Sequence, residues 1–522
     1  MGPTSRPRGG RKKGALSPPD VPSDARVVVT CGDLAVTSQD GSSCHAPSVV
    51  VPSGSTGVAP SLLPVEWVAA PSSTPSDPLP DLRPTRATMA YPVGSHWPTG
   101  LITLAVHLVT TAKLTFRSVP RVLAAVFGSL SGRRWDDRLS WTTVRTWLMR
   151  LGLSALLRPL PRADDWAYLV DHTIQIGTLK CFAVVGLRLS ECPDRCLRHG
   201  DLNLIALVPM ERSNAATVER ALGQAEQRTG PPRLIVSDQG RDVRAGIERY
   251  RQGHPQTVAT CDAAHQGANC LQRLLEGDPR WSAFVGQLGQ ARGRMRQTSL
   301  ACCLGQQLRP KARFMNLAAP LRWARWCLRL LDRAPSKDRP LTERQQAVLE
   351  GIDAEKLEAE LGWLRGYRRA VEQWSQWHEV IQVMVRQVRR QGIDRDTVAE
   401  LSRQYDAMEL MPSSRDTVAT LLEFIAEQAW VARLGGERLI ASTEVLESLF
   451  GAYKGLQGQQ SESGPTGLML VLGALVSHWT PETIQEALEA TPEKTVQAWI
   501  TKHLGPTVQA QRRTLQTIFS EP

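Results

Sequence analysis

The sequence predicts a mixed α/β core that is interrupted by a large all-helical insertion and preceded by a helical module. Strand-like apolar runs are confined to residues 163–265, and helical periodicity dominates from 266 to 440. The first 95 residues are instead rich in proline, serine and glycine. A chain of 522 residues is too long for one ordinary core, so about two to four domains are expected.

Residues 1–95 are predicted to be a disordered, basic tail. The segment starts with Arg6, Arg8, Arg11, Lys12 and Lys13 and then continues with many Pro, Ser and Thr residues. Such a composition cannot bury enough apolar surface to offset the entropy lost on ordering. We therefore expect a solvated tail, with nonspecific DNA contact by its basic start as the alternative.

Residues 100–155 are predicted to form three helices. Leu101–Leu108 and Val119–Leu130 have helical apolar spacing, and Ser140 can cap a third helix from Trp141 to Leu151. The third helix carries Arg145 and Arg150 on its outer face, which resembles a helix-turn-helix module that reads the major groove. The alternative is an ordinary helical lead-in to the next domain.

The α/β region reads as three strands in succession, followed by helix, strand, helix and strand. This order predicts a mixed sheet, because the later strands need crossover helices and the earlier ones do not. The expected strands are 167–170, 181–189, 202–208, 234–237 and 257–261, with helices at 214–227 and 243–250.

Two aspartates follow buried strands in this region. Asp171 comes after Trp166–Val170, and Asp238 comes after Arg233–Ser237, with Gly240 allowing the turn into a helix. Ligands of open α/β sheets bind at the carboxyl ends of strands. One such aspartate is commonly only a turn or cap residue, but two in one small sheet predict a site.

A third carboxylate opens a late helix in residues 441–460. Ser442 and Thr443 can cap this helix, and its apolar residues share one broad face. Glu447 and Lys454 are seven positions apart, which is about two turns, so both project from the opposite side. The helix can therefore pack on the sheet while presenting a carboxylate and a cation to one groove.

Between these motifs, residues 266–440 are predicted to be helical throughout, and 461–522 form a further helical region. The tryptophans here are expected in the core rather than as base-stacking platforms. They are Trp323, Trp326, Trp363, Trp374 and Trp377. The expected helices are Gln266–Glu276, Leu317–Asp332, Thr342–Val371, Trp374–Arg390 and Thr417–Arg433.

Together these segments resemble the catalytic motifs of DDE transposases of insertion-sequence type, which have an RNase H-like core and a helical insertion. Asp171, Asp238 and Glu447 match the family triad residue by residue, and Lys454 matches the basic residue two turns beyond the glutamate. Cys261–His265 is similar to the Cys/Asp-x-x-His element of hAT and Mutator-type transposases. The resemblance covers about residues 100–460.

The resemblance implies two Mg²⁺ (or Mn²⁺) ions that serve strand cleavage and strand transfer. Asp171 would bridge both ions, while Asp238 and Glu447 would each hold one. His265 would help to position the scissile phosphate. Asp262 remains an alternative third ligand in place of Glu447, and His172 is expected to point away from the site.

The expected partner is DNA, both element ends and target, bound by at least a dimer. A net charge of +11 suits a polyanion, since each basic side chain that meets a phosphate releases counterions. No apolar run is long enough for a membrane span or a secretory signal, so we expect a cytosolic, nucleoid-associated bacterial protein. The alternatives are an inactive transposase-derived DNA-binding protein and a structure-selective nuclease on the same fold.

A structural zinc site is the weaker interpretation of the cysteines. Cys192, Cys196 and His199 could supply three ligands, with Cys181 as a fourth. The segment is short and irregular, and no matching cysteine pair follows, so the sequence does not favour zinc.

Overall fold

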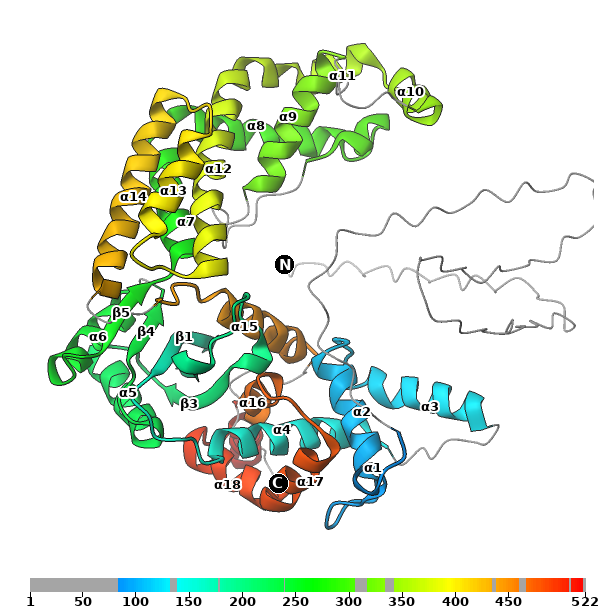
Figure 1. The fold of residues 1–522 in the computed structure, drawn as a ribbon. Coiled ribbons are helices and arrows are strands. Elements are labelled where there is room, and N and C mark those ends of the chain that lie inside the picture. Colours follow the sequence, from blue (N-terminus) through cyan, green and yellow to red (C-terminus); the bar gives the residue numbers. More distant parts are fainter. Residues whose placement is uncertain are drawn as a thin grey trace, which may run out of the picture. The chain divides into compact units, whose positions relative to one another are not determined.

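The computed structural model is mixed α/β, with many helices around one five-stranded sheet (Figure 1). It describes residues 83–131, 139–176, 179–238, 240–305, 317–333, 342–433, 438–459, 466–506 and 508–519. Most of the predicted tail lies outside these ranges. Its last part differs from the prediction, because α1 (Arg86–Met89) forms a helical turn closed by a Thr85–Thr88 capping box.

The sheet has the strand order β3-β2-β1-β4-β5. The β1–β2 and β2–β3 pairs are antiparallel, whereas β4 is parallel to β1 and β5 is parallel to β4. The predicted mixed sheet is thereby confirmed. Its strands are β1 (Trp166–Ile176), β2 (Leu179–Arg188), β3 (Asn203–Met210), β4 (Leu234–Ser237) and β5 (Val258–Cys261).

Each face of the sheet has its own helical cover. Trp166, Tyr168 and Val170 of β1 pack in the cluster formed with the crossover helices α5 (Ala215–Thr229) and α6 (Arg241–Gly253). The alternate residues of β1 belong to the larger core, which contains helix α15 (Glu444–Gln457). Side chains alternate along a strand, so Asp171 follows on the α15 side and His172 on the α5–α6 side.

In its described residues, the insertion after β5 consists of helices joined by turns and loops, with an isolated β-bridge between Ile393 and Leu439. Its aromatic core includes Trp281, Phe284 and Trp374, with ring centroids 5.1–5.7 Å apart. Trp326 departs from the expected core role, since it is 45% exposed. The helices are α7 (Ala263–Glu276), α8 (Pro279–Met295), α9 (Ala318–Leu331), α10 (Glu343–Glu350), α11 (Ala354–Leu361), α12 (Arg368–Gln391), α13 (Thr397–Asp406) and α14 (Pro412–Arg433).

The helix expected over Thr342–Val371 is broken into several pieces. Asp353 caps α11, and a 3-10 turn at Gly362–Tyr367 separates α11 from α12. Helix α8 was not predicted, although Asp278 followed by Pro279 is a recognisable helix start. Capping signals thus locate helix ends that apolar periodicity alone passes over.

The predicted N-terminal module does not stand apart from the C-terminal region. Its helices are α2 (Thr99–Thr110), α3 (Ser118–Ser131) and α4 (Trp141–Leu157), and α4 packs against α16 (Val471–Leu475) and α17 (Pro481–Ala490). A Cβ on Gly152 of α4 would come within 1.7 Å of the Leu470 carbonyl oxygen. Helix α4 is therefore packed closely against the C-terminal region, while Trp141 and Thr142 at its start stay exposed; its role in reading DNA stays a prediction.

Two further helices, α18 (Glu493–His503) and α19 (Val508–Phe519), follow α17. Among the described residues, no helix is both long enough and apolar enough to span a bilayer.

Candidate active site

Three aspartates lie at one level along the carboxyl edge of the sheet. Val170 of β1 pairs with Ser237 of β4, and Ser237 pairs with Cys261 of β5. The next residue on each strand is an aspartate, namely Asp171, Asp238 and Asp262. Parallel pairing in matched register is what brings these side chains, which are 24 to 91 residues apart in sequence, to one edge.

Asp171 lies where negative charge accumulates. Its carboxylate accepts a hydrogen bond from the His172 backbone at 2.6 Å. Burial and the neighbouring charge of Asp238 raise the pKa of Asp171 to about 7, with a smaller contribution from Glu447, while the charge of His265 acts in the opposite direction. The carboxylates of Asp171, Asp238 and Glu447, which the sequence singled out, are therefore close enough to repel one another.

Glu447 enters this group from α15, which packs on β1. Its Oε1 atom is 3.4 Å from Nδ1 of His265, and its side chain is 37% exposed. Burial raises the pKa of Glu447, although the charge of His265 opposes that shift. The pKa of His265 is raised to about 9, first by its hydrogen bond with Asp262 and then by the surrounding acids.

Asp262 has a different environment from the other two aspartates. It is fully buried, and Oδ1 accepts from the His265 backbone at 2.7 Å and from its Nδ1 at 3.2 Å. Oδ2 accepts from the backbone N–H of Thr443 and from its hydroxyl at 2.9 Å. These hydrogen bonds hold the pKa of Asp262 below its usual value despite burial. Asp262 thus joins the start of α7 to the start of α15.

Thr443 is a site residue that the sequence suggested only as a helix cap. It occupies the N-cap position of α15, but its hydroxyl donates to Asp262 and makes no cap hydrogen bond. The Ala263 backbone N–H also donates to Ala441 at 3.0 Å, and the Thr260 hydroxyl donates to Ile440 at 3.1 Å. These contacts fix the segment before α15 and therefore the direction of Glu447.

The donor chemistry fits a hard divalent cation, because Asp171, Asp238 and Glu447 offer carboxylate oxygens that lack enough protein donors. Asp238 accepts a hydrogen bond from the Gly240 backbone at 3.1 Å. Within the part of the chain that the structure describes, however, no three His, Cys, Asp or Glu side chains already form a group that could hold a metal ion.

The remaining predicted residues have separate environments. Lys454 is exposed on α15, and Arg145 is half-buried on α4. Arg150 donates to the Leu488 and Thr491 carbonyls at the end of α17, so its guanidinium is engaged inside the protein rather than facing outward. His172 contacts Phe182 and is 2.9 Å from the Ser213 hydroxyl, on the opposite face of the sheet from Asp171.

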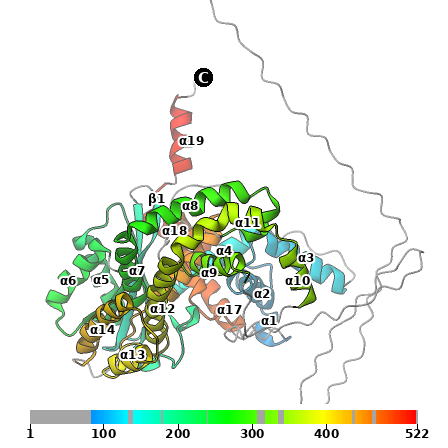
Figure 2. The same cartoon turned by 90° about the horizontal axis from the view of Figure 1, so that it is seen from above.

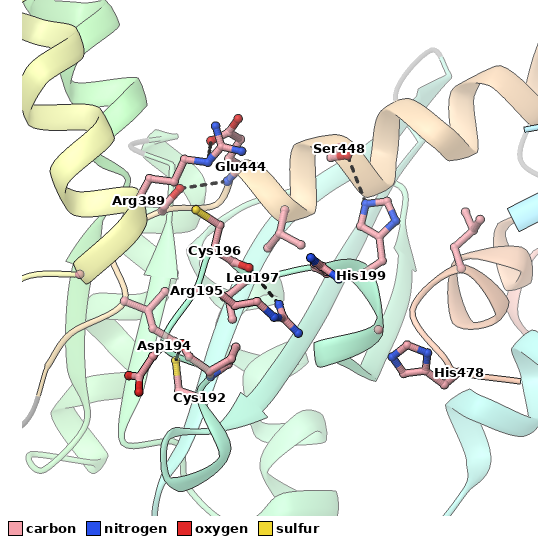
Figure 3. Close-up of a pocket in the computed structure, with 18 of the residues that line it drawn as sticks. Cys192, Asp194, Arg195, Cys196, Leu197, His199, Arg389, Glu444, Ser448 and His478 are labelled. Carbon is pink, nitrogen blue, oxygen red and sulfur yellow. Dashed lines mark hydrogen bonds and ion pairs between the residues drawn. The ribbon is translucent and has the colours of Figure 1, made fainter. Parts of the chain in front are cut away.

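A cavity of about 760 Å³ adjoins α15, but Asp171, Asp238 and Glu447 are not among its lining residues (Figure 3). Glu444 and Ser448 of α15 line it, and the Ser448 hydroxyl is 3.2 Å from Nε2 of His199. Cys192 and Cys196 also line this cavity. Cys181, the fourth ligand of the zinc alternative, is instead buried in β2 and is not among the residues that line this cavity.

No protein-family model matches the chain, and no curated protein sequence matches it. Function therefore has to be inferred from the geometry of these side chains.

Proposed function

We propose that the protein is a DDE-type DNA transposase whose triad is Asp171, Asp238 and Glu447. The observation that carries the proposal is that Asp171 and Asp238 follow paired residues of neighbouring strands, while Glu447, from a helix distant in sequence, reaches His265 at the same edge. Like charges that are brought together without a matching cation cost free energy. Such an arrangement is typical of a site that binds a cation or a developing charge.

The strand order supports an RNase H-like core for this proposal. Three antiparallel strands are followed by two parallel strands joined through helices, and the first aspartate lies on the central strand β1. The helical insertion between β5 and α15 agrees with the family resemblance of Asp171, Asp238 and Glu447. The net charge of +11 is complementary to a DNA backbone.

In this proposal each residue has a distinct role. Two Mg²⁺ or Mn²⁺ ions, when bound, would activate the attacking hydroxyl and stabilise the leaving oxygen. Asp171, Asp238 and Glu447 would hold them, with Asp171 between the other two. His265, cationic at neutral pH, would attract the scissile phosphate, and Lys454 would contact the backbone farther along α15. Asp262 orients His265 and α15, since both of its oxygens already accept hydrogen bonds from protein donors.

The test is nicking of supercoiled plasmid DNA by the full chain in Mn²⁺ or Mg²⁺. Wild type should cut only with the ion present. Asp171→Asn and Glu447→Gln should lose cutting but keep DNA binding, whereas Asp262→Asn should retain part of both. DNA binding by wild type without any cutting would instead identify a non-catalytic DNA-binding protein. Normal cutting by Glu447→Gln would show that the triad is assigned wrongly.

A further inference from the structure

The helical insertion carries a row of exposed arginines along α9. Arg322, Arg325 and Arg329 recur at helical spacing on its outer face, together with Trp326, which is 45% exposed. The helix contains no acidic residue. Its opposite face, including Leu321, Ala324 and Leu328, is buried.

Among the described residues, no carboxylate pairs with these arginines. Elsewhere on the insertion, arginines such as Arg365 and Arg368 pair with Asp332 at 2.6 Å. Within the described ranges, by contrast, none of the three α9 arginines forms an ion pair, and neither does Arg386 of α12. Unpaired cations on one face repel one another, so a folded protein gains by placing an anion there.

The arginine face of α9 continues onto α12. The two helices pack together, and Figures 1 and 2 both draw them side by side. Burial lowers the pKa of His378 of α12, and the nearby charges of Arg325, Arg322 and Arg386 lower it further. Stepping by 100° per residue, His378, Gln382 and Arg389 share one side of α12, and Arg386 borders it.

The far end of this side of α12 reaches the candidate active site. Arg389 pairs with Glu444 of α15 at 2.9 Å, and Glu447 follows one turn later. From His378 to Arg389 the helix rises about 16 Å. Exposed cations therefore lead from α9 along α12 to the carboxylates, with Glu379 as an exposed acid at the border.

We infer that this arginine stripe, formed by Arg322, Arg325, Arg329 and Arg386, binds the phosphate backbone of the DNA that is cut at the carboxylates. The inference rests on the proposed function and adds where the DNA lies, namely along α9 and α12. Guanidinium groups bind phosphate oxygens through paired hydrogen bonds and need no particular base sequence. The stripe would thus set affinity and direction, leaving sequence recognition to other parts of the chain.

The experiment compares two quadruple alanine variants of the full chain. The stripe variant is R322A/R325A/R329A/R386A, and the charge control is R220A/R244A/R403A/R415A, which removes four exposed arginines outside the stripe. Binding of a fluorescent random-sequence duplex of about three helical turns is measured by anisotropy at several salt concentrations. Circular dichroism checks that both variants fold.

The stripe variant should bind about 10- to 100-fold more weakly than the charge control, and its slope of log K against log salt should fall by about 3 to 4. Replacing the same four arginines by lysine should restore most of the slope, because the charge returns. Equal affinity and slope in both alanine variants would overturn the inference.

The outcomes separate this inference from the proposed function. If the wild type cuts plasmid in Mn²⁺ but the stripe variant binds the duplex as tightly as wild type, the inferred DNA-binding role of the stripe is wrong and the proposed transposase activity stands. If the wild type binds DNA through the stripe but never cuts it, the inferred binding role stands and the proposed transposase activity is wrong.

Discussion

Asp238 and Asp262 follow neighbouring parallel strands at the same level, yet their carboxylates differ in burial and in hydrogen bonding. Asp262 is fully buried, and four hydrogen bonds from protein donors occupy both of its oxygens. Asp238 is half-exposed and, among the described residues, accepts a single backbone hydrogen bond, while its charge raises the pKa of Asp171. The difference separates a carboxylate that maintains the structure from carboxylates available for chemistry.

The cause of the difference is what packs at each strand end. The segment before α15 lies on β5, so its Thr443 donors reach Asp262. At β1 and β4 the same helix instead presents Glu447, which is another acceptor. At this edge the charge of His265 compensates the three carboxylates only in part, so the edge is suited to bind further cations.

The largest expected effect is on the rate of DNA cleavage, and it tests whether the partly buried carboxylates are the catalytic ones. Asp171→Asn should lower the nicking rate by about 1000-fold or more, since the loss of one ligand removes several kcal/mol of transition-state stabilisation. Its melting temperature should stay equal or rise, because a repelled charge is removed. Single-turnover nicking and thermal unfolding measure the two effects. A variant that cuts normally but melts early would reverse the assignment.

The next largest effect is on stability, and it tests the structural role of Asp262. Asp262→Ala leaves the buried donors of Thr443 and His265 unsatisfied, so the free energy of unfolding should fall by about 3 kcal/mol. Thermal unfolding followed by circular dichroism checks this, with Asp238→Ala as the matched control at the neighbouring strand end. The control should change stability much less. Similar losses for the two variants would contradict the contrast between them.

A pH series sharpens the comparison without changing the fold. The pKa of Asp171 is about 7 in the folded chain and about 3.9 when unfolded, so its contribution to stability falls as pH rises from about 4 to 7. Asp171→Asn cannot titrate, so its melting temperature should exceed that of wild type by a few degrees, about 2–4 °C, above pH 7. The gap should close near pH 4. A gap independent of pH would point to another cause.

The smallest expected effect is a difference in stability between variants of two arginines of α4, one hydrogen-bonded inside the protein and one half-buried at its surface. Arg150 donates to carbonyls at the end of α17, so Arg150→Ala should cost about 1–2 kcal/mol. Arg145→Ala should change stability by less than about 0.5 kcal/mol. Thermal unfolding of the two variants measures the difference. Equal stability together with weaker DNA binding for Arg150→Ala would restore the DNA-reading role that the sequence suggested.

The sequence determined the local elements around the site. Apolar runs ending in Asp171 and Asp238 located two strands, and the amphipathic pattern around Glu447 located α15, all of which are present. These features depend on neighbouring residues, so periodicity and turn signals reveal them. Helix breaks were harder to predict, as the divided stretch from Thr342 shows.

Tertiary structure decided which charged side chains form hydrogen bonds inside the protein and which remain available to bind a ligand. Sequence left Asp262 as a possible ligand and Arg150 as a DNA contact, because a side chain looks the same whether or not a distant group binds it. Thr443 lies 181 residues from Asp262, and Leu488 lies 338 residues from Arg150. Only the folded chain brings such partners together, and hydrogen bonding and burial then set the role of each charge.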